Sequence, residues 1–199
     1  MMDSPYVRRV AISLKLMGIP FQHEAVSVFR HFDRFQSINP VVKAPTFVCD
    51  DGTVLMDSTL ILDWASTLVP REKRLMPLDD SAYLKAVHHL GLGLAAMEKC
   101  VQVYYEETLR PPEKLHKPWH DRVSAQMTTA YDLLEPVAAE ARPWLNGDRI
   151  MQPDVTIAAA WRFTQFIMPG RVDPARYPAL DAFSRRAEAL PEFLATPLD

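Results

Sequence analysis

The chain has 199 residues, of which 48% are hydrophobic and 24% charged, enough apolar material for one large domain or two small ones. Its net charge of −3 provides no basic field, so nucleic acid is not an expected partner. No apolar run approaches the roughly 20 residues of a membrane-spanning helix, and no signal peptide opens the chain. Two distant cysteines, Cys49 and Cys100, form no CxxC pair, which predicts a reduced, cytoplasmic protein.

The first predicted element is a helix that begins after Ser4 and Pro5. Serine is a favoured N-cap, proline a favoured first helical residue, and Gly18 a typical stop. The apolar residues between them share one face at helical spacing: Val7, Val10, Ala11, Leu14 and Met17. Residues 19–28 alternate raggedly between apolar and polar side chains and predict a strand. Residues 29–38 predict a loop with a short helix.

The most informative segment covers residues 39–58. Pro45 stands directly before a β-rich run, and a proline there donates no N–H and marks the start or edge of a strand. Residues 50–52 are a hairpin turn signal, and a second apolar run follows them. A helix pattern then begins at Ser58 and ends near Leu68.

The second half of the chain predicts helices alone. Strand signals vanish after about residue 78, and four helical patterns follow, over residues 81–109, 119–141, 153–167 and 179–189. The chain therefore predicts an α/β domain over residues 1–70, a linker over 71–80 and an all-helical domain over 81–199.

Two residues qualify these helices. Pro136 should kink the second helix or end it early. Asp154 occupies the acidic position of a capping box, although Met151 stands where that motif carries a hydroxyl residue.

The segment from residue 39 to 58 resembles the glutathione half-site of the glutathione transferases. The family pattern reads Asn-Pro-x-x-Lys-(Val/Ala)-Pro, then a hairpin, then (Glu/Asp)-Ser at a helix start. The residues that meet it are Asn39, Pro40, Lys43, Ala44, Pro45, Asp57 and Ser58. The resemblance covers the whole chain and implies a cytosolic, bacterial-type enzyme with a thioredoxin-like N-terminal domain, an all-helical C-terminal domain and a homodimeric state.

The resemblance also implies how glutathione binds. A cis proline at Pro45 would turn the backbone N–H and C=O of Ala44 outward, free to pair with an extended peptide. The helix start at Asp57 and Ser58 offers unpaired N–H groups to a carboxylate, and Lys43 adds a charge. The alternatives are a solvated Lys43 and a plain N-cap pair at Asp57 and Ser58.

The candidate catalytic residue is Ser4, because residues 4–8 match the Ser-Pro-(Phe/Tyr)-Val-Arg motif of serine-type members. There the hydroxyl stabilises the glutathione thiolate; the alternative is that Ser4 only caps the helix. Tyr6 is a rival hydroxyl and a candidate wall of the second-substrate pocket. The resemblance places Tyr104 and Tyr105 at that pocket too, and a core or interface role is the alternative.

The predicted function is conjugation of glutathione, as co-substrate, to a small hydrophobic electrophile, without cofactor or metal. Two histidine pairs, His88–His89 and His116–His120, lack the acid or cysteine cluster of a metal site. One feature favours the alternative of a non-catalytic binding module. The family has a central strand before the catalytic serine, whereas residues 1–3 leave that first strand apparently truncated.

Overall fold

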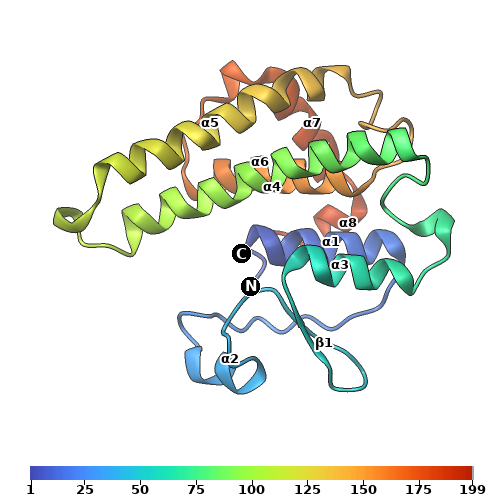
Figure 1. Cartoon of the computed structure of the whole chain (residues 1–199), viewed down its shortest axis with the longest axis horizontal. Helices are drawn as coiled ribbons and strands as arrows, with labels where there is room; N and C mark the ends of the chain where they lie inside the picture. Colours follow the sequence, from blue (N-terminus) through green and yellow to red (C-terminus); the bar gives the residue numbers. More distant parts are fainter. Residues whose placement is uncertain (199) are drawn as a thin grey trace. The chain divides into compact units, whose positions relative to one another are not determined.

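The computed structural model describes residues 1–198, which divide into two compact units (Figure 1). Residues 1–75 and the C-terminal segment from Pro191 form the first unit, and residues 76–190 form the second. The sequence had placed the C-terminal segment in the helical domain. It groups instead with the first unit, because the Arg8 Nε donates to the C=O of Thr196 at 2.8 Å. The guanidinium of Arg8 also lies over the ring of Phe193, 5.7 Å from its centroid.

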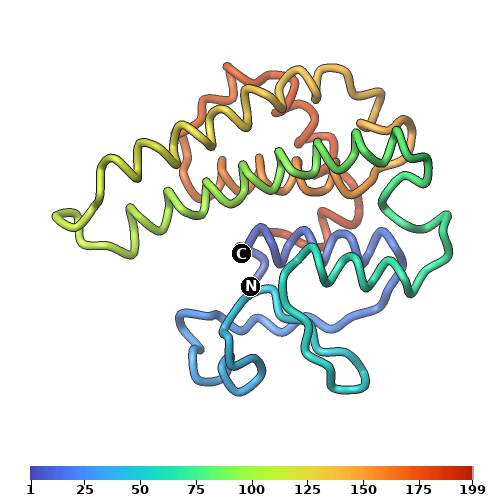
Figure 2. The backbone as a smooth tube through the Cα atoms, in the orientation of Figure 1, coloured from blue at the N-terminus to red at the C-terminus, as the bar shows by residue number. Residues whose placement is uncertain are grey.

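The elements of the first unit are α1 (Pro5–Met17), α2 (Phe32–Ile38), β1 (Thr46–Val48), β2 (Val54–Met56), α3 (Ser58–Thr67), the 3₁₀ helix η1 (Arg71–Lys73) and α8 (Pro191–Leu194). As predicted, Ser4 is the N-cap of α1 and Gly18 ends it with a φ of 73°. The hairpin is also confirmed, with β1 and β2 antiparallel and Phe47 opposite Leu55. Figure 2 traces this path through the unit.

The prediction of a strand over residues 19–28 was wrong. In the described part of the chain the sheet consists of β1 and β2, and no strand forms over residues 19–28. The residues before α1 form a turn, in which the N–H of Ser4 bonds the C=O of Met1 at 3.4 Å. Alternating apolar side chains alone do not make a strand, because the ladder requires a hydrogen-bonded neighbour.

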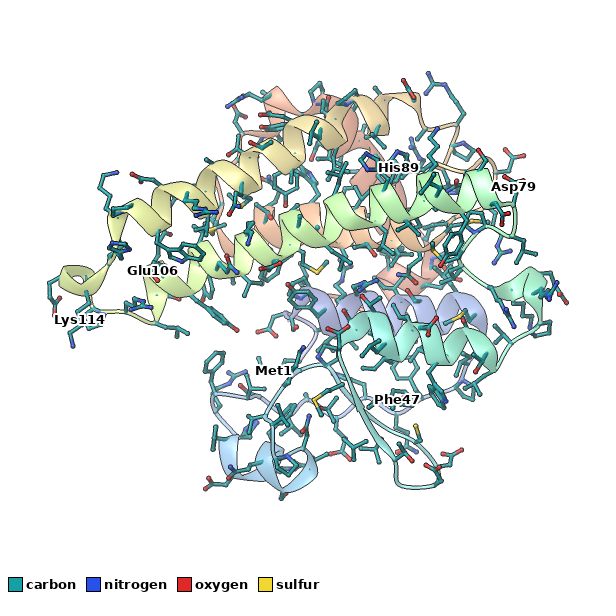
Figure 3. The ribbon with its side chains drawn as sticks, viewed as in Figure 1. Met1, Phe47, Asp79, His89, Glu106 and Lys114 are labelled. Carbon is teal, nitrogen blue, oxygen red and sulfur yellow. The ribbon has the colours of Figure 1, made fainter. Side chains whose placement is uncertain are left out.

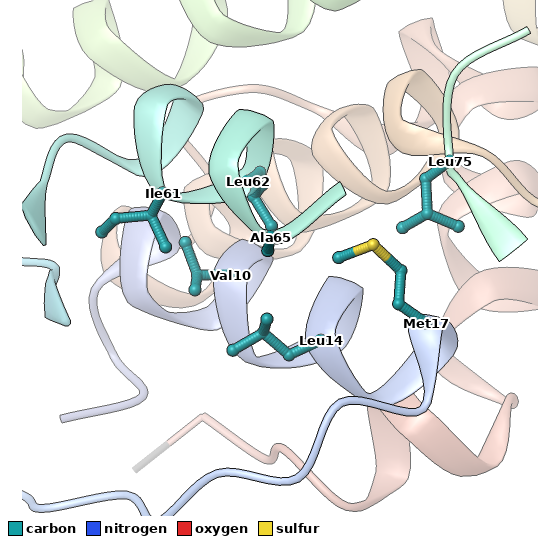
Figure 4. Packing of buried hydrophobic residues seen from close by; sticks show 7 residues of the cluster. All are labelled: Val10, Leu14, Met17, Ile61, Leu62, Ala65 and Leu75. Atoms are coloured by element: carbon teal, nitrogen blue, oxygen red, sulfur yellow. The ribbon is translucent and has the colours of Figure 1, made fainter. Parts of the chain in front are cut away.

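Helices α1 and α3 pack against each other in parallel. Figure 4 shows Val10 of α1 beside Ile61 of α3 at one end of their shared apolar cluster, and Met17 near Leu75 at the other. The remaining members are Leu14, Leu62 and Ala65. Because early residues of α1 meet early residues of α3, the two helix N-termini lie at the same end of the packed pair.

The second unit consists of helices, and the four predicted ones are confirmed close to their expected boundaries. They are α4 (Asp80–Thr108), α5 (Lys117–Glu140), α6 (Gln152–Ile167) and α7 (Pro178–Glu188), with 3₁₀ helices η2 (Pro112–Lys114) and η3 (Pro174–Arg176) between them. Of the two effects expected at Pro136, a kink or an early end, the early end was wrong, since α5 continues to Glu140. Pro136 lies near the end of α5, where its missing N–H removes a single backbone bond. Across the described residues, no helix combines the length and hydropathy needed to cross a bilayer.

The core of the second unit joins α4, α5 and α6. The rings of Tyr131 and Trp161 meet edge to face with centroids 5.2 Å apart. The hydroxyl of Tyr131 lies 2.5 Å from the Oγ1 of Thr164. At Gly93 of α4 an added Cβ would lie 3.1 Å from the Cγ1 of Ile157, so the backbone there approaches α6 closely.

The two glycines of α4 give a matched stability test. Gly91→Ala should raise the free energy of unfolding by about 0.5–1 kcal/mol, because its added Cβ meets nothing within 4 Å. Gly93→Ala should lower it by about 1–3 kcal/mol through overpacking against Ile157. Denaturant unfolding of both variants measures the difference. Equal effects at the two positions would contradict the close α4–α6 approach.

Asp154 organises the start of α6 from a buried position. Its Oδ2 accepts from the N–H of Met151 at 2.8 Å and its Oδ1 from the N–H of Leu145 at 2.9 Å. The predicted bond to the N-cap backbone is therefore confirmed, and the carboxylate holds a second loop residue as well. Burial raises the pKa of Asp154 from 3.8 to about 6, against the opposing effect of these hydrogen bonds.

Asp154→Ala should lower the free energy of unfolding by about 0.5–1 kcal/mol at neutral pH. Between pH 3.8 and about 6 the folded state binds more protons at Asp154 than the unfolded state does. The stabilising contribution of Asp154 therefore falls as pH rises through this window, and the loss in Asp154→Ala should be larger at pH 4.5 than at pH 7. Denaturant unfolding at both pH values tests this, with exposed Asp148→Ala as the control. An equal loss at the two pH values would contradict the raised pKa.

Candidate functional site

Asp57 shapes the N-terminus of α3. Its Oδ1 accepts from the N–H of Thr59 at 2.9 Å and of Leu60 at 3.4 Å, while its C=O accepts from the N–H of Ile61 at 2.9 Å. Its own backbone has a φ of 73°, which is unusual outside glycine. Among these first N–H groups of α3, that of Ser58 has no partner in the described chain. From the sequence we expected several unpaired N–H groups at this helix start, but two of them, those of Thr59 and Leu60, donate to the Asp57 side chain.

The Lys43 ammonium joins the loop before β1 to this helix start. Its Nζ lies 3.4 Å from the Oδ2 of Asp57, and both side chains are about half exposed. Burial works to raise the pKa of Asp57, but the N–H groups of Thr59 and Leu60 and the Lys43 ammonium outweigh it and lower the pKa. Asp57 therefore stays ionised at neutral pH, and Lys43 is held beside α3.

The loop that carries Ala44 is held in place by hydrogen bonds to the buried side chain of Asn39. The buried Asn39 donates to the Oγ1 of Thr46 at 2.8 Å and accepts from the N–H of Val41 at 3.0 Å. The peptide between Ala44 and Pro45 is cis, as predicted. In the described chain no hydrogen bond engages the N–H or C=O of Ala44. The backbone of Ala44 is thus free to pair with an extended ligand.

Arg9 is the residue that sequence reasoning missed. Its side chain is fully buried, and its Nη1 donates to the Oγ of Ser58 at 2.8 Å and the Oγ1 of Thr59 at 3.2 Å. Within the described residues its Nε and Nη2 have no hydrogen-bond partner. Burial lowers the pKa of Arg9 to about 10, while the negative charge of Asp57 acts to raise it. The sequence did carry a signal, because Arg8 and Arg9 are adjacent in a helix that is otherwise largely apolar. Adjacent residues of a helix point in different directions, so both arginines need not lie on a solvent-exposed face.

Ser4 lies at the N-terminus of α1, five residues before Arg9. Its half-buried side chain accepts from the N–H of Val7 at 3.4 Å, so it is an N-cap. That bond uses an oxygen lone pair and leaves the hydroxyl proton free to be donated. Arg9 connects α1 to Ser58, and Lys43 connects Asp57 to Ala44. These contacts gather Lys43, Asp57 and Ser58 at the start of α3, and Ser4 lies at the N-terminus of α1, the helix that packs in parallel beside it.

The remaining predicted residues come from both units. Tyr6 is half-buried in α1 of the first unit, while Tyr104 and the more exposed Tyr105 belong to α4 of the second. The prediction that all three line one second-substrate pocket stays a prediction. His120 pairs with Glu107 at 2.7 Å, and among the described residues no group of three metal-ligating side chains assembles.

The two cysteines differ in their surroundings. Cys100 is fully buried and burial raises its pKa to about 12, so it does not form a thiolate at neutral pH. Cys49 is half-buried near the hairpin turn, where slight desolvation and the neighbouring Asp51 and Asp50 raise its pKa. Neither thiol is poised for exchange chemistry.

Comparison with known proteins identifies the architecture. The family described as glutathione S-transferase, N-terminal domain, matches residues 1–73. A glutathione transferase family member from Pseudomonas fluorescens Pf-5, solved with bound glutathione, is 28% identical with a TM-score of 0.86 and covers 100% of this chain and 97% of its own. The chain has the glutathione S-transferase fold.

Two further relatives agree. A Methylobacterium radiotolerans JCM 2831 glutathione S-transferase in complex with glutathione sulfonate is 27% identical, with a TM-score of 0.83 and coverage of 98% and 91% of the two chains. The probable glutathione S-transferase GSTU6 of Oryza sativa subsp. japonica is 26% identical over 204 residues, 94% of this chain and 81% of the relative. The comparisons thus confirm the predicted fold class, a thioredoxin-like N-terminal domain followed by an all-helical domain.

The dependence of Arg9 on Ser58 can be measured in this fold. Ser58→Ala should lower the free energy of unfolding by about 1.5–3 kcal/mol, because a buried guanidinium loses a hydrogen-bond partner. Ser66→Ala in the same helix removes an exposed hydroxyl that bonds only the C=O of Asp63, and should change stability by less than about 0.5 kcal/mol. Denaturant unfolding compares them. Equal losses would show that Arg9 does not depend on Ser58.

Proposed function

We propose that this protein is a cytoplasmic, bacterial-type, serine-type glutathione transferase that conjugates glutathione to small hydrophobic electrophiles in detoxification. The observation that carries the proposal is the common end of α1 and α3, where Ser4, Ser58 and the Lys43–Ala44 segment come together. The solved relatives from Pseudomonas fluorescens and Methylobacterium radiotolerans hold glutathione and glutathione sulfonate, which supports glutathione as the ligand here. Both cysteines are free thiols, which fits a reducing compartment.

Glutathione is an extended tripeptide with two carboxylates, and the cluster offers matching partners. The open N–H and C=O of Ala44, next to Pro45, suit the cysteinyl backbone of glutathione in the manner of an added strand. The open N–H of Ser58 and the N-terminal end of α3 suit the γ-glutamyl carboxylate. Lys43 supplies a nearby positive charge that is shared with Asp57.

Ser4 then acts on the sulfur. Its hydroxyl proton donates to the glutathione thiolate, and the positive end of α1 adds to the stabilisation. Together they lower the thiol pKa from about 8.5 towards neutrality. The thiolate attacks the electrophilic carbon, a C–S bond forms, and the leaving group departs with its electron pair. The capping and catalytic roles of Ser4 are compatible, since one uses a lone pair and the other the proton.

Ser4→Ala should lower turnover at neutral pH and lose that defect as pH rises through the thiol pKa. Without the hydroxyl the thiol pKa rises, and one pKa unit corresponds to about 1.4 kcal/mol. The field at the start of α1 survives, so the loss should be partial. A pH–rate profile with 1-chloro-2,4-dinitrobenzene measures this, and Ser4→Thr, which retains the hydroxyl, is the matched control. Superimposed profiles of wild type and Ser4→Ala would make Ser4 only a cap and Tyr6 the next candidate.

We also propose a homodimer. The family resemblance motivates it, and exposed apolar side chains near the start of α4 support it, including Leu84 at 72% and Val87 at 42% exposure. Light scattering at micromolar concentration should give twice 22.6 kDa. Leu84→Glu should shift the protein towards monomer, while Leu194→Glu, at an equally exposed leucine of α8, should not. A monomeric wild type would overturn this proposal.

The alternative is a non-catalytic module with the same fold. The observation that favours it is the sheet of the described chain, which has two strands where the resemblance implies more. Retention on immobilised glutathione is the first test that separates a glutathione transferase from a non-catalytic module, because only the transferase must bind glutathione. A protein that neither binds glutathione nor accelerates its reaction with any electrophile would favour the module.

A further inference from the structure

The helical unit contains a pocket of about 410 Å³ between the last turns of α4 and the first turns of α5. Its lining consists of Gln102, Tyr105, Glu106, Leu109, Arg110 and Trp119. Figure 3 labels Glu106 near the C-terminal end of α4 and Lys114 in the connection beyond it. The volume falls within the usual range for small-molecule sites, which is roughly 300–1,000 Å³.

The walls of this pocket are mainly apolar and aromatic. Tyr105 and Trp119 are 41% and 39% exposed, and Leu109 is 54% exposed, so large apolar surfaces meet solvent at one place. The side-chain amide of Gln102 is already engaged, since it donates to Glu98 at 2.8 Å and accepts from Lys99 at 3.2 Å. The pocket thus offers two rings for stacking against a flat ligand.

The ionic groups of the lining are a buried acid and an exposed arginine. Both oxygens of Glu106 are occupied, because Oε1 accepts from the N–H of His116 at 3.2 Å and Oε2 lies 2.8 Å from the Nε of Arg110. Glu106 is 5% exposed, so it fixes the orientation of Arg110 from below. The Arg110 side chain is 57% exposed, and in the described chain no hydrogen bond or ion pair engages its two terminal nitrogens. A planar donor pair therefore remains for a carboxylate.

We propose that this pocket binds an aromatic ring that carries a carboxylate, with Tyr105 and Trp119 against the ring and Arg110 on the carboxylate. The prediction from sequence was a second substrate that is simply hydrophobic. A neutral aromatic compound would leave the open edge of Arg110 unused. An anionic one gains a charge-assisted, bidentate contact, which is what distinguishes this pocket from a general apolar surface.

Such a ligand has two possible sources, which share this chemistry. It is either the electrophile of the transferase reaction or an aromatic acid that binds without reacting. The first source rests on the proposed function, whereas the binding of an aromatic carboxylate does not. The experiment therefore measures binding and conjugation separately.

The binding arm uses 4-nitrobenzoate and the neutral, nearly isosteric 4-nitrobenzamide, titrated against the whole protein without glutathione. Wild type should bind the carboxylate at least about tenfold more tightly, a difference of about 1.4 kcal/mol, with quenching of tryptophan fluorescence that Trp119→Phe largely removes. Arg110→Gln should abolish the preference. Arg185→Gln should retain it, because Arg185 also forms an i,i+4 ion pair, with Asp181 at 3.1 Å, but does not line the pocket.

Arg110→Lys covers the case in which Arg110→Gln fails to fold. It keeps the charge beside Glu106 but lacks the fork, so it should retain only part of the preference. Equal affinity of wild type for the acid and the amide, or an undiminished preference in Arg110→Lys and Arg110→Gln, would overturn the inference.

The conjugation arm compares 4-chloro-3-nitrobenzoate with 4-chloro-3-nitrobenzamide, each rate divided by the uncatalysed reaction with glutathione. Thiolate attack at the chlorinated carbon forms the C–S bond and releases chloride in both. A normalised preference for the carboxylate that falls about tenfold in Arg110→Gln identifies the ligand as the substrate. A binding preference without a matching preference in conjugation identifies a non-reacting acid. Absence of catalysis with these two electrophiles and with 1-chloro-2,4-dinitrobenzene, in a protein that does not bind glutathione, overturns the proposed function and leaves the binding arm to decide the pocket.

Discussion

The contact between the buried guanidinium of Arg9 and the hydroxyl of Ser58 is the interaction on which the candidate site depends. Burial of a charge is costly unless it is paired, and two of the Arg9 nitrogens have no partner. Its pKa falls to about 10, so Arg9 still carries its charge at neutral pH. The hydroxyls of Ser58 and Thr59 are therefore its direct support, and they hold the beginning of α3 against α1. A positive charge is thereby placed beside the N-terminus of α3, which already favours anions.

Few hydrogen-bond donors at the start of α3 remain available to a ligand. Asp57 uses the N–H groups of Thr59 and Leu60, so the opening of α3 is reduced to Ser58. Asp57 also holds Lys43, and through it the loop that presents Ala44. The Asp57 carboxylate thus holds the parts of the site together, and it also takes up two N–H donors that a ligand could otherwise use. A positive-φ backbone at Asp57 is part of how one residue reaches its own helix and Lys43 together.

Local signals in the sequence were sufficient for the longer helices and for the hairpin, but not for the four-residue helix α8. Ser4 and Gly18 bound α1 because a cap and a stop act on their immediate neighbours, and the cis peptide before Pro45 followed from the family pattern. The strand over residues 19–28 was not predictable from alternation, since its formation requires a partner that the chain does not place beside it. Arg9 escaped notice because burial of a charged side chain depends on packing against residues 50 positions away. The attachment of the C-terminal segment through Arg8 and Thr196 is equally non-local.

Val42 has a backbone conformation that its own side chain disfavours. It is a β-branched residue with a φ of 52°, a region that such side chains strongly disfavour, and it stands directly before Lys43. The N–H of Val42 donates to the C=O of the buried Asn39 at 2.9 Å, and the side-chain amide of Asn39 holds Val41 and Thr46 on either side of it. Position 42 is therefore a place where directed evolution can gain stability without altering a ligand-facing side chain. Asparagine, which tolerates the left-handed region, is the natural first choice in such a library.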